Sequence, residues 1–300
     1  MSAQLTPNDF KISRIVAGMM NLSAWRMSTP ELVNWIHACL EMGITTFDHA
    51  DIYGGYTCES VFGQALAAEP GLRDKMQLVS KCGIQLVTGN RPANRVHHYD
   101  TSAAHIVASA EQSLRNLHTD YLDVLLIHRP DPLLDADEVA AAFAQLRQAG
   151  KVRHVGVSNF TPWQFDLLAS RLDFPLVTNQ IEFSVMHLDP LHDGSLDQCQ
   201  QHHVVPMAWG PLGGGELFHA DIPRAHRLRG KLTEICEEVG DMGIDQVAIA
   251  WLLTHPAGVV PVLGTGKLER LRSAVAAQSI QLTRQQWFAI WEASAGREVP

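Results

Sequence analysis

The sequence predicts a single α/β domain, a (β/α)8 TIM barrel with an eight-stranded parallel sheet and extra helices in its C-terminal part. Two observations support this: apolar, β-branched runs of five to eight residues occur eight times, and helical patterns alternate with them. Such alternation indicates βα units and a parallel sheet, and eight units suggest a closed barrel. The alternative is an open doubly wound sheet, which usually carries Gly-x-Gly-x-x-Gly after its first strand; residues 17–22 here read AGMMNL.

The expected strands are bounded by glycine, proline or polar residues and are rich in Val, Ile and Leu. They are Ser13–Gly18, Ile44–Asp48, Met76–Lys81, Tyr121–His128, Val152–Ser158, Leu176–Gln180, Val204–Trp209 and Val259–Leu263.

The first expected helix begins with Thr29 as its N-cap, followed by Pro30 and Glu31, and stops at Gly43. The others show the apolar spacing of a helix that covers a sheet. They are Glu59–Ala68, Thr101–Leu117, Asp137–Ala149, Thr161–Arg171, Ser195–His203, Lys231–Val239 and Ile244–Thr254, with one more opening after Gly264.

Two stretches interrupt the alternation, and both follow the C-terminal ends of expected strands. Gly83–Asp100 is a long polar loop, and Gly210–Gly230 is a glycine-rich segment. Beyond Gly230 there are two helical patterns where one would complete the seventh unit, so an extra helix is implied. Residues 1–300 contain no stretch that resembles an interdomain linker.

The composition limits the class of protein. Lys plus Arg number 23 and Asp plus Glu 32, which gives a formal net charge of −9 and argues against a surface for nucleic acid or anionic membranes. No apolar run reaches the ~18 residues of a membrane span, and the N-terminus lacks a signal pattern. The five cysteines form no Cys-x-x-Cys pair, which suits a reducing compartment. We therefore expect a cytoplasmic protein.

Polar side chains stand at the ends of three consecutive expected strands. Asp48 ends the second strand, Lys81 the third and His128 the fourth, and Tyr53 follows Asp48 by five residues. Because strand ends of a barrel meet at one mouth, we expect the four side chains to come together. A lysine ammonium lowers the pKa of a nearby tyrosine, a carboxylate can hold the lysine, and a neutral histidine can donate to a carbonyl oxygen. The group favours proton transfer to an oxygen that gains negative charge, although each residue alone has an ordinary structural explanation.

A second polar set ends the next three strands. Ser158, Asn159 and Gln180 carry hydroxyl or amide groups that could bind a carboxamide, and the indole of Trp209 could stack on a ring. Ordinary turn chemistry is an equally good explanation for any one of them.

Two later segments could bind phosphate. Leu212-Gly213-Gly214-Gly215 could bring backbone N–H groups close to a ligand, although such runs are usually flexible turns. After the eighth strand, Thr265, Gly266, Lys267 and Arg270 open a helix, and we expect Lys267 and Arg270 to share one helical face. The alternative is a capped surface helix with solvated charges.

A catalytic metal is not expected, although the chain has fifteen histidines. His97-His98 and His202-His203 are adjacent pairs whose side chains diverge, and the ligand spacings His-x-His, His-x-x-x-His and His-Glu-x-x-His do not occur.

Several ordered motifs resemble the aldo-keto reductase family. Thr46–Gly54 contains its Asp-x-Ala-x-x-Tyr-Gly pattern, and Val79–Lys81 is similar to its lysine strand. Leu125–His128 is similar to its histidine strand, and Gly156–Phe160 to its cofactor motif. The stretch Asp48–Tyr56 is most similar to a bacterial oxidoreductase group within the family.

The resemblance extends over residues 12–283 and implies a (β/α)8 barrel that binds NADPH/NADP+ across its mouth and reversibly reduces aldehydes or ketones. By position, Tyr53 corresponds to the proton donor, Lys81 and Asp48 to the pair that tunes it, and His128 to the residue that orients the small-molecule carbonyl substrate.

The resemblance also assigns the cofactor contacts. Ser158, Asn159 and Gln180 correspond to contacts of the nicotinamide carboxamide, and Trp209 to the stacking aromatic. The pyrophosphate loop corresponds to Gly210, Pro211, Leu212, Gly213 and Gly214, and the 2′-phosphate contacts to Thr265, Lys267 and Arg270. Where the family often has Glu-Asn for the adenine, this chain has Ser273 and Ala274.

Two other functions compete with a reductase. One is a nucleotide-binding barrel that regulates a partner protein with little turnover, because a fold alone does not establish an activity. The other is a metal-dependent hydrolase barrel. The presence of all four reactive residues favours the reductase.

Overall fold

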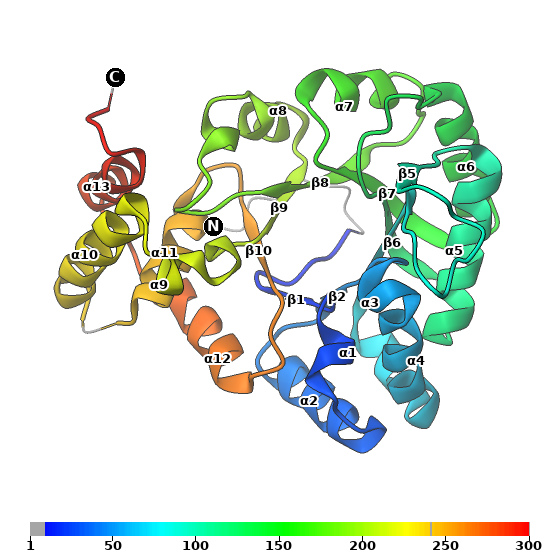
Figure 1. Cartoon of the computed structure of the whole chain (residues 1–300), viewed down its shortest axis with the longest axis horizontal. Coiled ribbons are helices and arrows are strands. Elements are labelled where there is room, and N and C mark those ends of the chain that lie inside the picture. Colours follow the sequence, from blue (N-terminus) through cyan, green and yellow to red (C-terminus); the bar gives the residue numbers. More distant parts are fainter. Residues whose placement is uncertain (1–9, 241, 300) are drawn as a thin grey trace.

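The eight expected strands form a closed parallel barrel with the helices outside it (Figure 1). The computed structural model describes residues 10–240 and 242–299. The order around the barrel is β1-β10-β9-β8-β7-β6-β3-β2, and neighbouring strands pair in parallel. The barrel strands are β1 (Val16–Gly18), β2 (Thr46–Asp48), β3 (Gln77–Cys82), β6 (Leu122–Ile127), β7 (Val152–Ser158), β8 (Leu176–Glu182), β9 (Val205–Trp209) and β10 (Val260–Leu263).

The covering helices follow the strands in turn, and the expectation of an extra helix is confirmed. Both α10 and α11 lie between β9 and β10 in the chain, and the C-terminal α13 packs against α10. The longer helices are α2 (Thr29–Glu41), α4 (Cys58–Ala68), α5 (Ala103–Leu117), α6 (Ala136–Gln148), α7 (Pro162–Ala169), α8 (Ser195–His202), α10 (Pro223–Glu238), α11 (Ile244–Thr254), α12 (Leu268–Ala276) and α13 (Arg284–Ala295). Short helical turns are α1 (Leu22–Trp25), α3 (Tyr53–Tyr56), α9 (Glu216–His219) and the 3-10 segments Pro70–Lys75, Asp189–Leu191, Gly213–Gly215 and Ala277–Ser279.

Helix starts follow local capping chemistry, which explains why α2 and α6 begin at other residues than the sequence predicted. The N-cap of α2 is Ser28, not Thr29, because the Glu31 carboxylate accepts a hydrogen bond from the Ser28 backbone at 2.8 Å. The N-cap of α6 is Asp135, two residues before the expected start; its carboxylate accepts from the backbone of Asp137 at 2.9 Å.

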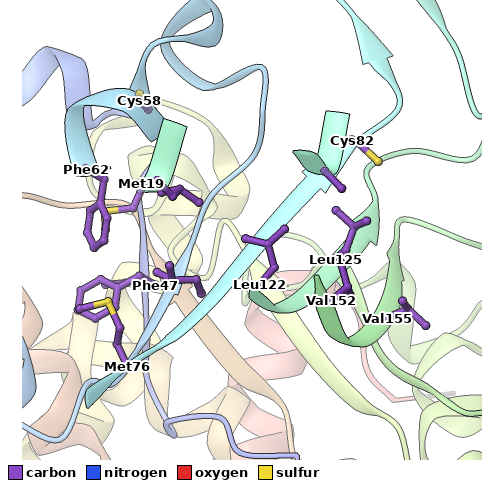
Figure 2. Close-up of a cluster of buried hydrophobic side chains, with 14 of the residues drawn as sticks. Met19, Phe47, Cys58, Phe62, Met76, Cys82, Leu122, Leu125, Val152 and Val155 are labelled. Carbon is purple, nitrogen blue, oxygen red and sulfur yellow. The ribbon is translucent and has the colours of Figure 1, made fainter. Parts of the chain in front are cut away.

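The apolar core has an inner and an outer part. Inside the barrel, Val79, Val124, Leu126 and Met207 belong to one buried cluster. Between the barrel and its helices a larger cluster includes Phe47 and other residues of β2, β3 and β6 (Figure 2). The rings of Phe47 and of Phe62 on α4 lie 5.4 Å apart between their centroids, which fixes α4 against the sheet.

The two irregular stretches contain more structure than expected. The 83–100 segment includes an antiparallel pair, β4 (Ile84–Gln85) with β5 (His98–Tyr99), so it is not simply a loop. The 210–230 segment contains a 3-10 turn, α9 and the first turns of α10, which starts at Pro223 instead of Lys231. Proline at that first helical position suits the start of a helix, because its missing N–H would have no partner there.

Candidate active site

Strand alternation places the reactive side chains at one end of the barrel interior. Side chains two residues apart on a strand share a face. Val79 and Leu126 belong to the inner core, so Lys81 and His128 also point inward, one step nearer the C-terminal ends. The structure brings together the four residues that the sequence singled out through two hydrogen bonds of Lys81 and one ring contact; they are Asp48, Tyr53, Lys81 and His128.

Lys81 is the centre of this group and is fully buried. Its Nζ donates hydrogen bonds to Asp48 Oδ2 at 2.7 Å, to the backbone oxygen of His49 at 2.8 Å and to the hydroxyl of Tyr53 at 2.9 Å. Burial acts to lower the pKa of Lys81, but Asp48 and Tyr53 outweigh it and hold this pKa above its ordinary value. Lys81 therefore stays protonated and uses its three N–H donors.

Gln180 holds the other oxygen of the aspartate. Its Nε2 donates to Asp48 Oδ1 at 2.8 Å, and both side chains are buried. The sequence predicted Gln180 only as a cofactor contact. The structure adds a second role, because the Gln180 amide fixes the carboxylate that pairs with Lys81.

His128 lies beside the tyrosine and is neutral. The rings of Tyr53 and His128 are 5.9 Å apart and nearly perpendicular. Burial, with the charges of Lys81 and Arg129, lowers the pKa of His128 well below its usual value. Its Nδ1 is buried and has no hydrogen-bond partner among residues 10–240 and 242–299, whereas Nε2 is not a buried atom without a partner. The proton is therefore better placed on Nε2, where an arriving oxygen can accept it.

The prediction that Lys81 lowers the pKa of Tyr53 is confirmed for the effect of Lys81 itself, but burial outweighs that effect. Burial raises this pKa above its ordinary value; Lys81 and Arg129 act in the opposite direction, and Asp48 adds to the rise. The sequence could not show this, because the sign depends on how completely the phenol is buried. Tyr53 therefore holds its proton at neutral pH.

A second hydrogen-bonded chain follows the next strands. The indole Nε1 of Trp209 donates to Asn159 Oδ1 at 2.9 Å, and Asn159 Nδ2 donates to Ser158 Oγ at 2.8 Å. Ser158 Oγ in turn donates to the backbone oxygen of Gln180 at 2.9 Å. These contacts connect the four residues expected to meet a carboxamide and a ring, and they fix the half-exposed indole of Trp209.

The glycine-rich turn after β9 is shaped by its backbone. Gly213 has φ +60°, and a Cβ there would come within 2.8 Å of Met186, so only glycine fits. Gly210 and Gly214 also have φ near +60°, Pro211 is buried and Leu212 is half-buried. Around Gly214 there is open space, so the turn presents bare backbone at the barrel mouth.

The cationic segment after β10 differs in one respect from the prediction. Lys267 is the N-cap of α12 and not a helical residue, so it does not share a helical face with Arg270 as expected. The side chains of Lys267 and Arg270 are exposed, and Thr265 Oγ1 accepts from the backbone of Lys267 at 3.2 Å. Gly266 lies against Trp25, whose ring would be 2.8 Å from an added Cβ.

Ser273 and Ala274, the residues at the positions expected to contact the adenine, are both engaged inside the fold. Ser273 Oγ donates to Asp245 Oδ2 of α11 at 2.6 Å, and Ala274 is buried. Neither side chain is available as an adenine contact.

A buried polar layer behind the site was missed from the sequence. Ser80 faces outward because its neighbour Lys81 faces inward, and its hydroxyl donates to Glu59 Oε1 at 2.7 Å. Ser109 donates to Asp51 Oδ2 at 2.8 Å. Asp51 Oδ1 and both ring nitrogens of His49 are buried and have no hydrogen-bond partner in the part of the chain that the structure describes. Burial raises the pKa of Asp51 to about 7 and lowers that of His49 to about 3. The available signal was the alternation after Asp48, where the polar residues His49 and Asp51 are separated by Ala50.

The 83–100 segment forms part of the rim next to Tyr53. Tyr56 on α3 accepts from the backbone of Leu86 at 2.9 Å, and Arg91 stacks on the Tyr56 ring at 4.2 Å. Asn90 donates to the backbone oxygen of Gly55 at 2.7 Å. These contacts attach the segment to α3 beside the reactive group.

The described residues contain neither a metal-binding cluster nor a membrane-spanning helix. Over 10–240 and 242–299, His, Cys, Asp and Glu side chains form no group of three or more that could hold a metal ion. No helix in this part of the chain is both long and apolar enough to cross a membrane. The five cysteines are buried and free.

Comparisons with known proteins agree on one family. The model of the aldo/keto reductase family matches residues 14–295. The oxidoreductase YdhF of Escherichia coli is 54% identical over 296 residues, covering 99% of this chain and 98% of YdhF. A 6-dehydroglucose reductase of Agrobacterium fabrum is 49% identical, with 96% of each chain covered. In structure, the glycerol dehydrogenase AKR11B4 of Gluconobacter oxydans superposes with a TM-score of 0.84 at 27% identity, covering 97% of this chain and 94% of that chain.

Proposed function

The chain belongs to the aldo/keto reductase family, and we propose that it is an NADPH-dependent enzyme that reduces an aldehyde or ketone to an alcohol, with Tyr53 as the proton donor. The observation that carries the proposal is the contact of Tyr53 with Lys81 at 2.9 Å, in a buried group that also contains Asp48 and lies beside a neutral His128.

The residues at the mouth fit a nicotinamide nucleotide. Trp209 offers a flat, half-exposed ring held by Asn159, next to the hydroxyl of Ser158. The turn at Gly213 and Gly214 presents backbone at the same mouth. When bound, NADPH would supply a hydride to the carbonyl carbon.

Tyr53 and His128 handle the oxygen. His128 donates a hydrogen bond from Nε2 to the carbonyl oxygen and orients it. As negative charge develops on that oxygen, Tyr53 transfers its proton. A pKa raised by burial suits this role, because the phenol keeps its proton until a much more basic alkoxide forms.

Lys81, Asp48 and Gln180 act behind the tyrosine. The Lys81 ammonium stabilises the phenolate left after proton transfer. Asp48 holds Lys81, and Gln180 holds Asp48, so the ammonium has a fixed position before any substrate arrives.

A preference for NADPH over NADH rests on the charged side chains after β10. Lys267 and Arg270 are exposed at the first turn of α12, with Thr265 just before them. Ammonium and guanidinium groups beside a helix N-terminus suit a phosphate dianion better than a ribose hydroxyl.

The names of relatives indicate a first set of substrates. Proteins that are 49% and 35% identical to this chain are called 6-dehydroglucose reductases. We therefore place 6-dehydroglucose and simpler hydroxylated aldehydes among the carbonyl compounds to be tested first.

The test is oxidation of NADPH, followed at 340 nm, against a panel of aldehydes, ketones and quinones. We expect turnover of at least one carbonyl class by the wild-type protein and its loss in Tyr53→Phe. Tight NADPH binding without turnover of any carbonyl would instead favour a regulatory barrel and contradict the proposal.

A further inference from the structure

Arg129 is a positive charge at the mouth of the barrel that the proposed mechanism does not use. It follows His128 directly, at the C-terminal end of β6, and is half-buried. Its Cζ lies 5.5 Å from the centre of the Trp209 ring. The guanidinium thus lies beside the aromatic expected to meet the cofactor, on the residue that follows the reactive histidine.

The Arg129 guanidinium has no anionic partner in the part of the chain that the structure describes, 10–240 and 242–299. The nearest carboxylate in sequence, Asp131, is engaged elsewhere: it accepts from Thr101 Oγ1 at 2.9 Å and from the Leu133 backbone at 2.8 Å. Asp48, the buried carboxylate of the reactive group, is bound by Lys81 and Gln180.

Arg129 is also close enough to the reacting groups for its charge to act on them. It lowers the pKa of both Tyr53 and His128, after the larger effects of burial and Lys81. The guanidinium therefore lies at the same mouth as the two groups that would meet a carbonyl oxygen, beside the half-exposed ring of Trp209.

We propose that Arg129 is a substrate-binding residue that selects carbonyl compounds carrying an oxygen acceptor, a hydroxyl or a carboxylate, on the chain next to the carbonyl. Five N–H donors in a rigid fork suit such groups, and a half-buried guanidinium without a protein acceptor gains most from a ligand that provides one. The cation–π contact with Trp209 holds the fork over the mouth while leaving its edge free to donate. The inference rests on the proposed reductase function and names its substrate class.

The test compares three substrates in wild type and Arg129→Met. Glyceraldehyde carries hydroxyl groups, succinic semialdehyde carries a carboxylate, and butanal carries neither. We expect kcat/KM to fall about ten- to a hundredfold for at least one oxygenated substrate, the range for a hydrogen bond to a charged group, while butanal changes less than about threefold. The substrate that loses most identifies hydroxyl or carboxylate as the recognised group.

Two further variants separate recognition from indirect effects. Arg129→Lys keeps the charge but not the fork, so it should restore more activity toward the carboxylate than toward the hydroxyl groups. Arg147→Met is the matched control: it removes a guanidinium stacked 3.9 Å from Phe174, at the last turn of α6 and away from the mouth. It should leave the three-substrate pattern unchanged.

Two results would overturn the inference. An equal loss for all three substrates would mean that Arg129 acts through Tyr53 or Trp209, and a matching loss of NADPH affinity by fluorescence titration would assign it to the cofactor. No loss for either oxygenated substrate would also exclude the role. If wild type reduced none of a broad panel of carbonyls, the proposed function itself would fail, which is a distinct outcome.

Discussion

Replacing Lys81 by methionine should move the pH profile of alcohol oxidation to higher pH. Oxidation requires the phenolate of Tyr53, and the Lys81 ammonium is 2.9 Å from that oxygen. Two unit charges at this distance attract by about 1.4 kcal/mol at the dielectric constant of water and by about 6 kcal/mol at an effective value near 20. Removing this attraction destabilises the phenolate, so the pKa of Tyr53 should rise.

The choice of variants has to account for the buried aspartate. Lys81→Met alone leaves Asp48 with only Gln180 as a partner, and an unpaired buried charge costs about 3–5 kcal/mol of stability. The double variant Lys81→Met/Asp48→Asn removes both charges and avoids this cost. Asp48→Asn alone is the contrasting variant. Removing the Asp48 charge lowers the pKa of Tyr53, whereas a Lys81 that is held less firmly lets this pKa rise, so the two effects oppose each other.

The assay is the initial rate of alcohol oxidation from pH 7 to 11 with saturating cofactor. Below the pKa of Tyr53 the rate should fall about tenfold for each unit by which that pKa rises. We expect the largest loss in Lys81→Met, a smaller one in the double variant and the smallest in Asp48→Asn. Unmoved profiles in both Lys81 variants, with chemistry rate-limiting, would refute the coupling of Lys81 to Tyr53.

Three other predictions test separate parts of the protein. Tyr53→Phe should lower the rate of carbonyl reduction by about 10²–10⁴-fold with little change in NADPH affinity, and a near-normal kcat would exclude Tyr53 as the acid. Arg270→Ala should weaken NADPH binding about ten- to a hundredfold and NADH binding hardly at all in fluorescence titrations; equal losses would show that Arg270 supports α12 instead of binding the 2′-phosphate. Asp51 keeps its proton to about pH 7 in the folded state but ionises near 3.8 when unfolded, so its contribution to stability is lost as pH rises through that interval. Asp51→Asn should therefore gain up to about 4 kcal/mol relative to wild type between pH 4 and 8 in urea unfolding, and identical pH dependence of the two proteins would contradict this assignment.

The barrel and the reactive group could be predicted because both depend on local patterns. Apolar runs of strand length mark β2, β3 and β6, and the period of two within a strand determines that Lys81 and His128 point inward. Once the strands close into a barrel, their C-terminal ends meet, which brings the tyrosine that follows Asp48 next to Lys81.

The rest depends on contacts between distant parts of the chain. Gln180 is 132 residues from Asp48, and no local pattern pairs the two. The β4–β5 pair lies in a polar segment without strand alternation, so its fold is set by contacts such as that of Tyr56 with Leu86. The N-cap role of Lys267 follows from where α12 begins, a boundary that sequence patterns place only within a few residues.

The charges around Lys81 explain why a single lysine can control Tyr53. Asp48 is paired with Lys81 and with the Gln180 amide. Burial keeps His49 neutral, with a pKa of about 3, and it raises the pKa of Glu59 above its ordinary value. Lys81 is itself fully buried, so water does not screen its charge from the phenol. A single unscreened ammonium 2.9 Å from the hydroxyl is therefore the largest charge effect on the phenolate, second only to burial, which is why neutralising Lys81 should change the pH profile more than any other substitution behind Tyr53.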